Sequence, residues 1–366
     1  MFISTADKGY PDLPVLSATQ DRGMIRRDQN SINISHDKNN ENGYKRVLPG
    51  QFVIHLRSFQ GGFAHSRIEG ITSPAYTIFG FSEPKKHDSE YWKYVFTSKE
   101  FIRRLETVTY GIRDGRSISY DEFLTLDFFF PSVEEQEKIS QYLDELTHLI
   151  TLHQRKLDKL VNVKKSMLEK MFPQQGSRIP EIRFCGFTDD WEQRKLEEIV
   201  QITMGQSPDG STYSNEPSDY ILIQGNADLL NGWVSPRIWT TQITKKADAG
   251  DLIMSVRAPA GSMGKTAYDA VIGRGVAAIK GNEFIYQLLV KMDEVGYWKT
   301  FSCGSTFESL SSDTIKNAKV NVTLIAEQTQ IGLFLNQLDS LITLHQRVKS
   351  LKIDIITKKG VLNNGI

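Results

Sequence analysis

The sequence predicts an α+β protein: two similar mixed α/β domains separated by two long antiparallel helices that form a coiled-coil-like spacer. The first observation is a repeat, because LITLHQR occurs at residues 149–155 and again at 341–347, 192 residues later. The second is a long heptad pattern of apolar residues around each copy. The third is that the remainder of each half carries short strand-like runs beside glycine turns. One duplicated unit of domain size accounts for all three.

The repeat continues upstream of LITLHQR at the same offset, which excludes a solenoid, whose repeats are a few tens of residues long. A length of 366 residues is typical of two or three domains, and the duplication selects two. The pairs that match at this offset are Glu135-Gln136 with Glu327-Gln328, Ile139 with Ile331, Leu143 with Leu335, and Leu146 with Leu338.

Composition excludes several classes of protein. Lysine and arginine number 44 and the acidic residues 44, so any nucleic-acid surface must come from local clusters of charge. Cys185 and Cys303 are isolated, which argues against a zinc site or a disulfide framework and fits a reducing, cytoplasmic location. The first residues, MFISTADKGYPDLP, lack the apolar core of a signal peptide, and no run is long enough to span a bilayer.

The first long helix is predicted over residues 132–172. Ser132 can cap it, and Glu135 three residues later completes a capping box. Apolar residues then recur every three, four or seven positions, interrupted only by Lys164. The members of this seam are Ile139, Leu143, Leu146, Ile150, His153, Leu157, Leu160, Met167 and Met171.

The second long helix, predicted over residues 323–362, carries the same seam. Leu149, Leu152, Leu341 and Leu344 widen both stripes, and stripes this wide need a partner along most of their length. We expect the two helices to pack on each other; the alternative is that each packs on its own half. The expected helix–helix interface consists of Leu143, Leu146, Ile150, His153, Leu157, Leu335, Leu338, Ile342 and His345.

The remaining boundaries follow from composition. The stretch 173–188 contains prolines, a glycine and polar residues, and it is predicted to be a linker. This leaves residues 1–131 and 189–322 as the two globular domains. FTDDWEQRKLEEIV, at 187–200, is predicted to be a short amphipathic helix.

The globular parts also align with each other. RVLPGQFVIHLRS (46–58) matches KADAGDLIMSVRA (246–258), and GIRDGRSISYDEF (111–123) matches CGSTFESLSSDTI (303–315). Each pair suits a strand leaving a glycine turn, or a Gly/Ser loop ahead of the next strand.

Four features together identify a family: the paired helices, the Glu-Gln pair near each helix start, PEIRFCGFTDDWEQRKLEEI at 180–199, and the loop GSTFESLS with its degenerate partner GIRDGRSIS. In these the chain resembles the specificity subunit of type I restriction-modification systems. The resemblance spans nearly the whole chain. It implies two target-recognition domains, each reading half of a bipartite double-stranded DNA site, with the helices as a spacer that holds the methyltransferase subunits.

The resemblance also implies the partners and cofactors. Catalysis and ATP-driven translocation would belong to the methyltransferase and restriction/translocase subunits, which would use S-adenosylmethionine and ATP with magnesium. This chain would hold no cofactor or metal and would not be an enzyme alone. The runner-up hypothesis is a structural protein that dimerises through its helices without sequence-specific DNA binding.

The first domain departs from the family pattern. The alignment of the halves places Met1 near Gly210, so that the first half has no counterpart of about thirty residues that open the second half. We therefore expect an N-terminally incomplete first recognition domain.

Two enzymatic signals are weak. GSMGKT, at 261–266, resembles a phosphate-binding loop, but Pro259 stands where that motif needs its first glycine. His153 and His345 lie on the apolar seams, where a packing role is favoured over a zinc site with only two ligands. We find no methyltransferase tetrapeptide, nucleophile elbow or zinc-binding helix.

The DNA-binding candidates are basic and amide side chains on loops, because arginine suits guanine, lysine suits phosphate, and asparagine or glutamine suits adenine. Each alone is also compatible with an ordinary solvated surface position. By the resemblance, Lys265 would meet phosphate. The candidates are Arg57, Ser58, Arg113 and Arg116 in the first half, and Gln224, Asn226, Lys245, Lys246, Arg257, Lys265 and Arg274 in the second.

The length of the helices constrains the spacing of the two half-sites. Residues 133–171 would span roughly 58 Å at ~1.5 Å per residue, against about 34–36 Å for one turn of DNA. Two domains held at opposite ends would address grooves about one turn apart. Since their sequences differ, the target should be asymmetric.

Overall fold

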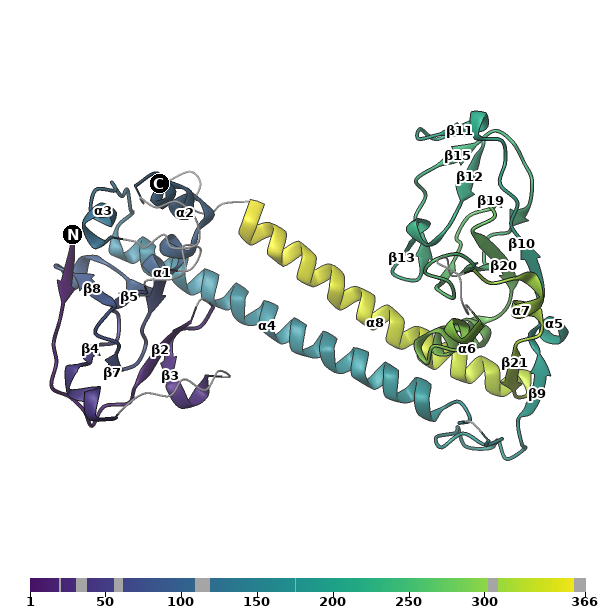
Figure 1. The fold of residues 1–366 in the computed structure, drawn as a ribbon, viewed down its shortest axis with the longest axis horizontal. Helices are drawn as coiled ribbons and strands as arrows, with labels where there is room; N and C mark the ends of the chain where they lie inside the picture. The colour runs from purple at the N-terminus through teal and green to yellow at the C-terminus, as the bar shows by residue number, and fades with distance from the viewer. Residues whose placement is uncertain are drawn as a thin grey trace. The chain divides into compact units, whose positions relative to one another are not determined.

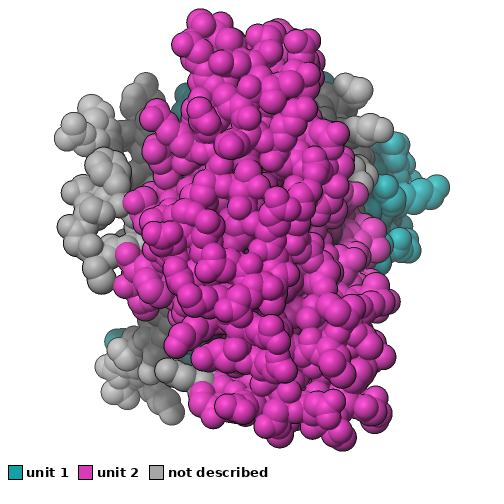
Figure 2. All heavy atoms as spheres, turned by 90° about the vertical axis from the view of Figure 1, so that its right-hand side faces the viewer, with its two compact units in different colours: residues 1–152, 350–366 teal, residues 153–349 magenta. Residues whose placement is uncertain are grey.

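The computed structural model describes residues 1–19, 21–30, 38–55, 62–108, 119–174, 176–301 and 309–358, the last ten as helix backbone only. The chain divides into two compact units, residues 1–152 with 350–366 and residues 153–349 (Figures 1 and 2). Within the described ranges, no helix is long and apolar enough to cross a membrane.

The first unit contains a four-stranded antiparallel sheet in the order β1–β8–β5–β6. Two small sheets, β2–β3 and β4–β7, accompany it. The elements are β1 (Phe2–Thr5), β2 (Leu16–Thr19), β3 (Gly23–Arg26), β4 (Lys45–Val47), β5 (Phe52–Ile54), β6 (Phe63–His65), β7 (Gly70–Thr72), β8 (Thr77–Phe81), α1 (Ser89–Thr97), α2 (Lys99–Val108) and α3 (Tyr120–Phe123).

Aromatic side chains fill the core between this sheet and its helices. Phe52, Phe79 and Phe123 are fully buried. Phe2 of β1 contacts Phe79 edge-on, with ring centroids 5.5 Å apart, and it lies 5.0 Å from Phe123. Buried aromatic rings of this kind contribute strongly to the stability of a core.

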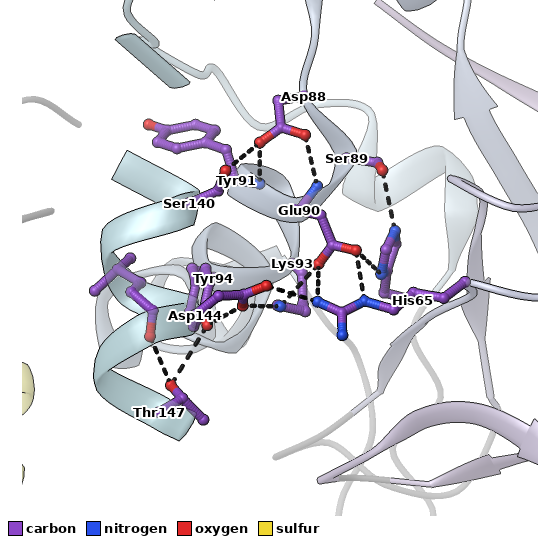
Figure 3. Close-up of polar contacts among 12 residues, drawn as sticks. His65, Asp88, Ser89, Glu90, Tyr91, Lys93, Tyr94, Ser140, Asp144 and Thr147 are labelled. Carbon is purple, nitrogen blue, oxygen red and sulfur yellow. Dashed lines mark hydrogen bonds and ion pairs between the residues drawn. The ribbon is translucent and has the colours of Figure 1, made fainter. Parts of the chain in front are cut away.

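Polar contacts fasten α1 to the first turns of the long helix α4 (Val133–Lys170), as Figure 3 shows. Asp88 caps α1 by accepting from the amide of Tyr91 at 3.1 Å, and it also accepts from Ser140 Oγ at 2.5 Å. Asp144 accepts from Lys93 Nζ at 2.7 Å and from Tyr94 Oη at 2.5 Å. The capping and ionic contacts fix the direction in which α4 leaves the sheet.

The second unit contains sheets in the orders β10–β20–β17–β18–β14–β13 and β11–β15–β12–β19–β16, and the pair β9–β21. Its strands are β9 (Glu192–Lys195), β10 (Gln201–Met204), β11 (Tyr213–Ser214), β12 (Tyr220–Ile223), β13 (Leu229–Leu230), β14 (Trp233–Val234), β15 (Trp239–Thr240), β16 (Lys246–Ala247), β17 (Leu252–Ser255), β18 (Met263–Lys265), β19 (Ala270–Ile272), β20 (Val276–Lys280) and β21 (Lys319–Val322). Its shorter helices are α5 (Leu196–Ile199), α6 (Glu283–Glu294) and α7 (Ser312–Lys316).

The two halves share the order of four sheet strands, and this order corrects the predicted alignment. The order β1–β8–β5–β6 matches β10–β20–β17–β18, and α1 and α6 each follow the matching strand. Because β1 pairs with β8 as β10 pairs with β20, Met1 corresponds to a position next to Val200. The predicted match of Met1 with Gly210 is therefore wrong.

The predicted amphipathic helix over 187–200 is also wrong. Residues 192–195 form β9, which pairs antiparallel with β21, and only the single turn of α5 is helical. Trp191 is buried just before β9. The four residues of β9, EQRK, are all exposed, so the strand follows from its pairing with β21 and has no apolar–polar alternation in the sequence.

The second long helix, α8 (Ile325–Lys358), packs antiparallel against residues 153–170 of α4 within the second unit. His153 Nδ1 and His345 Nδ1 are 2.9 Å apart, and Lys164 Nζ donates to Asp339 Oδ1 at 2.6 Å. Residue numbers that increase along α4 thus face residue numbers that decrease along α8, so the two helices run antiparallel. The two LITLHQR copies meet at their histidines.

The predicted helix–helix interface residues are buried or half-buried in both units. Leu157, Leu335, Leu338 and His345 are buried in the second unit, and His153 and Ile342 are half-buried. In the first unit, Leu143 is buried while Leu146 and Ile150 are half-buried. The predicted α+β class with its two long helices is confirmed.

The widening of the stripe by four further leucines is not confirmed. Leu149, Leu152, Leu341 and Leu344 are 42%, 45%, 43% and 55% exposed. Within each unit the packed seam is therefore narrower than the apolar stripe, since helices in antiparallel contact bury only the facing positions.

Candidate nucleic-acid interface

Three loops of the second unit meet at one end of its sheets. They are residues 205–209 after β10, 224–228 after β12, and 273–275 between β19 and β20. The amide of Gln206 donates to the carbonyl of Ile272 at 2.8 Å, and the amide of Gly273 donates to that of Ile223 at 2.8 Å. Backbone hydrogen bonds thus hold the loops together. We call them, with residues 235–237 and 256–257, the loop surface.

Glycines allow the close approach of these loops. A Cβ on Gly275 would lie 2.0 Å from the carbonyl oxygen of Gln224, and one on Gly205 would lie 2.1 Å from that of Gly273. No larger residue fits at either place without moving backbone. The spacing of the functional side chains is therefore set by rigid backbone contacts.

Asp228 organises the second loop. Its Oδ2 accepts from the amides of Gln224 at 2.7 Å and Gly225 at 3.2 Å, while its Oδ1 accepts from Arg237 Nε at 3.0 Å and Nη2 at 2.8 Å. The Asp228 side chain is 3% exposed and that of Arg237 is 52% exposed. The buried carboxylate thus orients an exposed guanidinium and presents Gln224 and Asn226, both half-buried, beside it.

Arginines complete the loop surface. The amide of Arg274 donates to Ser207 Oγ at 3.2 Å, and the amide of Val256 donates to the carbonyl of Gly275 at 2.9 Å. These contacts join the backbone segments that carry Arg257 and Arg274, both of which are exposed. Arg257 also forms an isolated bridge with Ser309. Of the predicted residues, Gln224, Asn226, Arg257 and Arg274 therefore come together.

Two predicted lysines lie at the margin of the loop surface. The carbonyl of Lys245 accepts from the amide of Ile272, directly before the 273–275 loop, and its side chain is exposed. Lys246 Nζ lies 5.3 Å from the centroid of the Tyr220 ring, toward the start of β12. Asp209 is an exposed acid in these loops, and hydrogen bonds from Ser211 lower the pKa of its carboxyl group.

Lys265 is placed elsewhere. Its Nζ donates to Glu283 Oε2 at 2.9 Å and to Asn336 Oδ1 of α8 at 3.4 Å, and it lies 4.6 Å from the Tyr286 ring centroid. Burial raises the pKa of the Tyr286 phenol, so that ring stays neutral. The ammonium group of Lys265 therefore has intramolecular partners, and Lys265 is not part of the loop surface. The phosphate contact expected for Lys265 stays a prediction.

The same contacts explain the GSMGKT stretch. Residues 261–266 run from the β17–β18 turn through β18, and Ala258-Pro259 is a cis peptide bond. A phosphate-binding loop instead connects a strand to a helix and presents its lysine to the nucleotide. The structure therefore favours a structural role for this stretch.

Four predicted residues of the first half, Arg57, Ser58, Arg113 and Arg116, lie outside the described residues. Three residues of the loop surface escaped the sequence analysis: Gln206, Ser207 and Arg237. Gln206 and Ser207 follow Gly205 and had a detectable signal, a Gly-polar turn after a strand. Arg237 had none, since its partner Asp228 becomes adjacent only in the fold.

Comparison with known proteins shows which protein family the second half of the chain resembles. Residues 188–352 match the family model described as the type I restriction modification DNA specificity domain. The second half of the chain, from before β9 into α8, is thus similar to such a domain, and the resemblance found in the sequence is confirmed.

Individual relatives extend the similarity. The chain is 29% identical over 330 residues to the MjaX specificity subunit of a type I restriction enzyme from Methanocaldococcus jannaschii, covering 84% of this chain and 75% of that protein. A solved S subunit of a type I restriction-modification system from M. genitalium aligns with a TM-score of 0.56 at 14% identity, over 97% of this chain and 94% of that one. A chain from a structure on complex assembly and conformational transition of the type I R-M system aligns with a TM-score of 0.54 at 20% identity, over 97% and 94%. At these identities the two structures support the fold.

Proposed function

We propose that the chain is the DNA-recognition subunit of a type I restriction-modification complex in the cytoplasm. The observation that carries this proposal is the loop surface, where exposed Arg257 and Arg274 and the half-exposed Arg237 side chain lie on loops held by hydrogen bonds to the loop of Gln224 and Asn226. Arginine reads guanine and binds phosphate, and carboxamides read adenine, so this surface has the chemistry for base readout.

The two halves would read different half-sites. Residues 1–131 and 189–322 are the proposed recognition domains, with Arg57, Ser58, Arg113 and Arg116 acting in the first. Their loops differ in sequence, so the proposed target is bipartite and asymmetric. The chain would be non-catalytic, and methyltransferase and restriction/translocase subunits would supply S-adenosylmethionine and ATP/magnesium chemistry.

The exposed leucines support docking of partners on the helices. Leu341 and Leu344 are large apolar side chains left in solvent on one helix of the second unit, and exposed apolar positions of this kind mark interaction surfaces. They equally favour the second candidate, a structural protein that dimerises through its helices. Sedimentation distinguishes the two: a stable homodimer without sequence-selective DNA binding would support the second.

The test of the proposed function is methylation by the chain co-purified with its modification subunits, read by single-base sequencing of methylated DNA. We expect a gapped, asymmetric two-part motif. The double variant Arg257→Ala/Arg274→Ala should lower methylation at that motif about ten-fold or more, since each good arginine–base contact contributes about 1–3 kcal/mol. Lys195→Ala, which removes an exposed charge on β9, is the matched control.

Three outcomes would count against the proposal or part of it. Methylation by the chain alone would refute a non-catalytic role. Arginine variants that match Lys195→Ala would remove the loop surface from DNA recognition. A motif with one defined half, or a palindrome of it, would mean that the first half is silent and that two copies act together.

A further inference from the structure

One end of the first unit corresponds to the loop surface of the second unit. β7 pairs antiparallel with β4 (Figure 1), as β19 pairs with β16, and β7 leads into residues 73–76 as β19 leads into residues 273–275. Lys45 of β4 lies opposite the last residue of β7, and the carbonyl of Lys245 accepts from the amide of the last residue of β19 at 2.8 Å. Lys45 therefore corresponds to Lys245, which lies at the margin of the loop surface.

A second correspondence lies on the other side of β7. β3 pairs antiparallel with β2, which places Arg26 opposite Leu16, and the side chain of the last residue of β7 donates to the Leu16 carbonyl at 3.3 Å. In the second unit, β12 lies between β19 and β15 in the same way. The amide of Leu222 donates to the carbonyl of Ile238 at 2.9 Å, so the next pair along these strands joins the last residue of β12 with Arg237. Arg26 therefore corresponds to Arg237 of the loop surface.

Three cations of the first unit, Lys8, Lys45 and Arg26, lie along one line across its strands, and we call them the cation row. Lys8 forms an isolated bridge with Lys45, and β7 and β2 separate Lys45 from Arg26. Neighbouring strands lie about 4.8 Å apart, so the line extends over roughly 19 Å between the Cα atoms of Lys8 and Arg26. Lys8 is exposed and Lys45 is half-buried. The Arg26 side chain is 53% exposed, and its exposed ion pair with Asp28, at 3.6 Å, is of a kind that contributes little to stability.

The two lysines of the cation row lie close together without an acidic partner among the described residues. The carboxylates of Asp7 and Glu69 bind Arg46 instead, at 3.4 and 2.6 Å. Burial, and after it the charge of Lys8, lowers the pKa of the Lys45 ammonium group. Like charges on facing strands destabilise a sheet. An anion bound between the two lysines would therefore stabilise this part of the first unit.

The cation row reaches the end of the first unit that corresponds to the loop surface. Lys45 Nζ donates to the carbonyl of Tyr76, in the loop of residues 73–76, at 2.7 Å. By the register of β1 with β8 and of β10 with β20, Lys8 corresponds to Gln206 of the loop surface. A lysine thus stands in the first unit where the second unit has a neutral amide.

We propose that the cation row binds the phosphate backbone of DNA at the first half-site, an inference that rests on the proposed function. Lys8, Arg26 and Lys45 stand at positions that correspond to residues in or beside the loop surface, and each supplies a positive charge. Contacts with phosphate fix the position of a protein on the duplex but carry no sequence information. The cation row therefore contributes affinity and salt dependence, and it leaves the bases of the recognised motif unchanged.

The experiment measures binding of a labelled mixed-sequence duplex by the full-length chain with its modification subunits, using fluorescence anisotropy from low to moderate salt. Each phosphate contact contributes about −0.9 to the slope of log affinity against log salt. Lys8→Gln/Lys45→Gln should make the slope shallower by about two contacts, and Lys8→Gln or Arg26→Gln alone by about one. Lys8→Arg/Lys45→Arg keeps both charges and should retain the slope. Lys85→Gln/Lys99→Gln removes two exposed lysines of the same unit outside the cation row and is the matched control.

Slopes of the cation-row variants that match the slope of the control would overturn the proposal. A change in the bases of the methylated motif would overturn it as well, since it would mean that the row reads sequence. Lys45 is half-buried, so urea unfolding accompanies the double variant. If that variant is destabilised, Lys8→Gln and Arg26→Gln decide the outcome, because both alter exposed side chains.

Failure of the cation row is distinguishable from failure of the proposed function. A gapped methylated motif together with unchanged slopes overturns the cation row alone. Shallower slopes in a complex without selective methylation overturn the proposed function alone. A complex that binds no duplex overturns both.

Discussion

At the scale of single residues, Asp228 is the side chain on which the loop surface depends. It is buried, it accepts from two backbone amides of the Gln224 loop, and it holds Arg237 by two hydrogen bonds. Replacing it by asparagine turns one acceptor toward these donors into a donor, which leaves buried groups unpaired. We expect Asp228→Asn to lower the free energy of unfolding by about 1–3 kcal/mol and to reduce target methylation further than this loss explains.

The measurement compares urea unfolding with methylation at saturating protein. Asp269→Asn is the matched control, since Asp269 is exposed, lies outside the loop surface and accepts from the amide of Ala249 at 2.8 Å. If methylation falls only in proportion to the folded fraction, Asp228 stabilises the domain without positioning the loop for DNA.

How far single residues are predictable from sequence depends on what places them. Gln224, Asn226, Arg257 and Arg274 were predicted because each follows a strand-like run or lies in a glycine loop, and such loops are where binding residues concentrate. Arg237 was missed because its orientation comes from a carboxylate that only the fold brings into reach. Lys265 has a loop-like sequence context, yet its neighbours Glu283 and Asn336 are distant in the chain.

At the scale of elements, β6 and α1 predict a pH dependence of the first unit. Burial lowers the pKa of His65 to about 4, against an ordinary value of 6.5, although Glu90 at 3.9 Å partly opposes this effect. Between pH 6.5 and 4, the His65 imidazole therefore binds a proton in the unfolded chain and stays neutral in the folded unit. Stability should fall as pH falls through this window, by up to about 3 kcal/mol.

Urea unfolding at pH 7, 5.5 and 4, followed by fluorescence, measures this loss. His65→Gln keeps a side chain able to bond Ser89 Oγ, which lies 3.1 Å from His65 Nε2, and cannot take up the proton (Figure 3). We expect it to flatten the pH dependence, leaving the contribution of His87, whose pKa burial also lowers, and, toward pH 4, those of Glu90 and Asp144, whose pKa values are lowered as well. The exposed His148→Gln is the control, and an equal flattening there would contradict the assignment to His65.

Elements differ in how much of them the sequence predicts. The long helices were predictable since heptads report local periodicity, and the histidines of LITLHQR mark where they cross. The exposure of Leu341 and Leu344 was not, because a sequence pattern does not say which flank of a stripe faces the neighbouring helix. The sequence predicts a helix where β9 forms, because the pairing partner of β9, β21, lies far along the chain. Tertiary pairing there outweighed local spacing.

At the scale of the whole molecule, 44 basic residues balance 44 acidic ones, so bulk attraction to DNA is absent and local clusters must provide it. Binding to mixed-sequence duplex, by the chain with its modification subunits, should then weaken linearly with log salt, by a slope of about −0.9 per phosphate contact. Arg274→Ala should make that slope shallower by about one contact, whereas Lys195→Ala should leave it unchanged. Slopes measured by anisotropy from low to moderate salt test this expectation. An unchanged slope for Arg274→Ala would mean either that the arginine reads bases without contacting phosphate or that the loop surface faces away from DNA. Methylation by the Arg257→Ala/Arg274→Ala variant separates these two cases. Only base reading by the arginine predicts that this variant loses methylation at the motif.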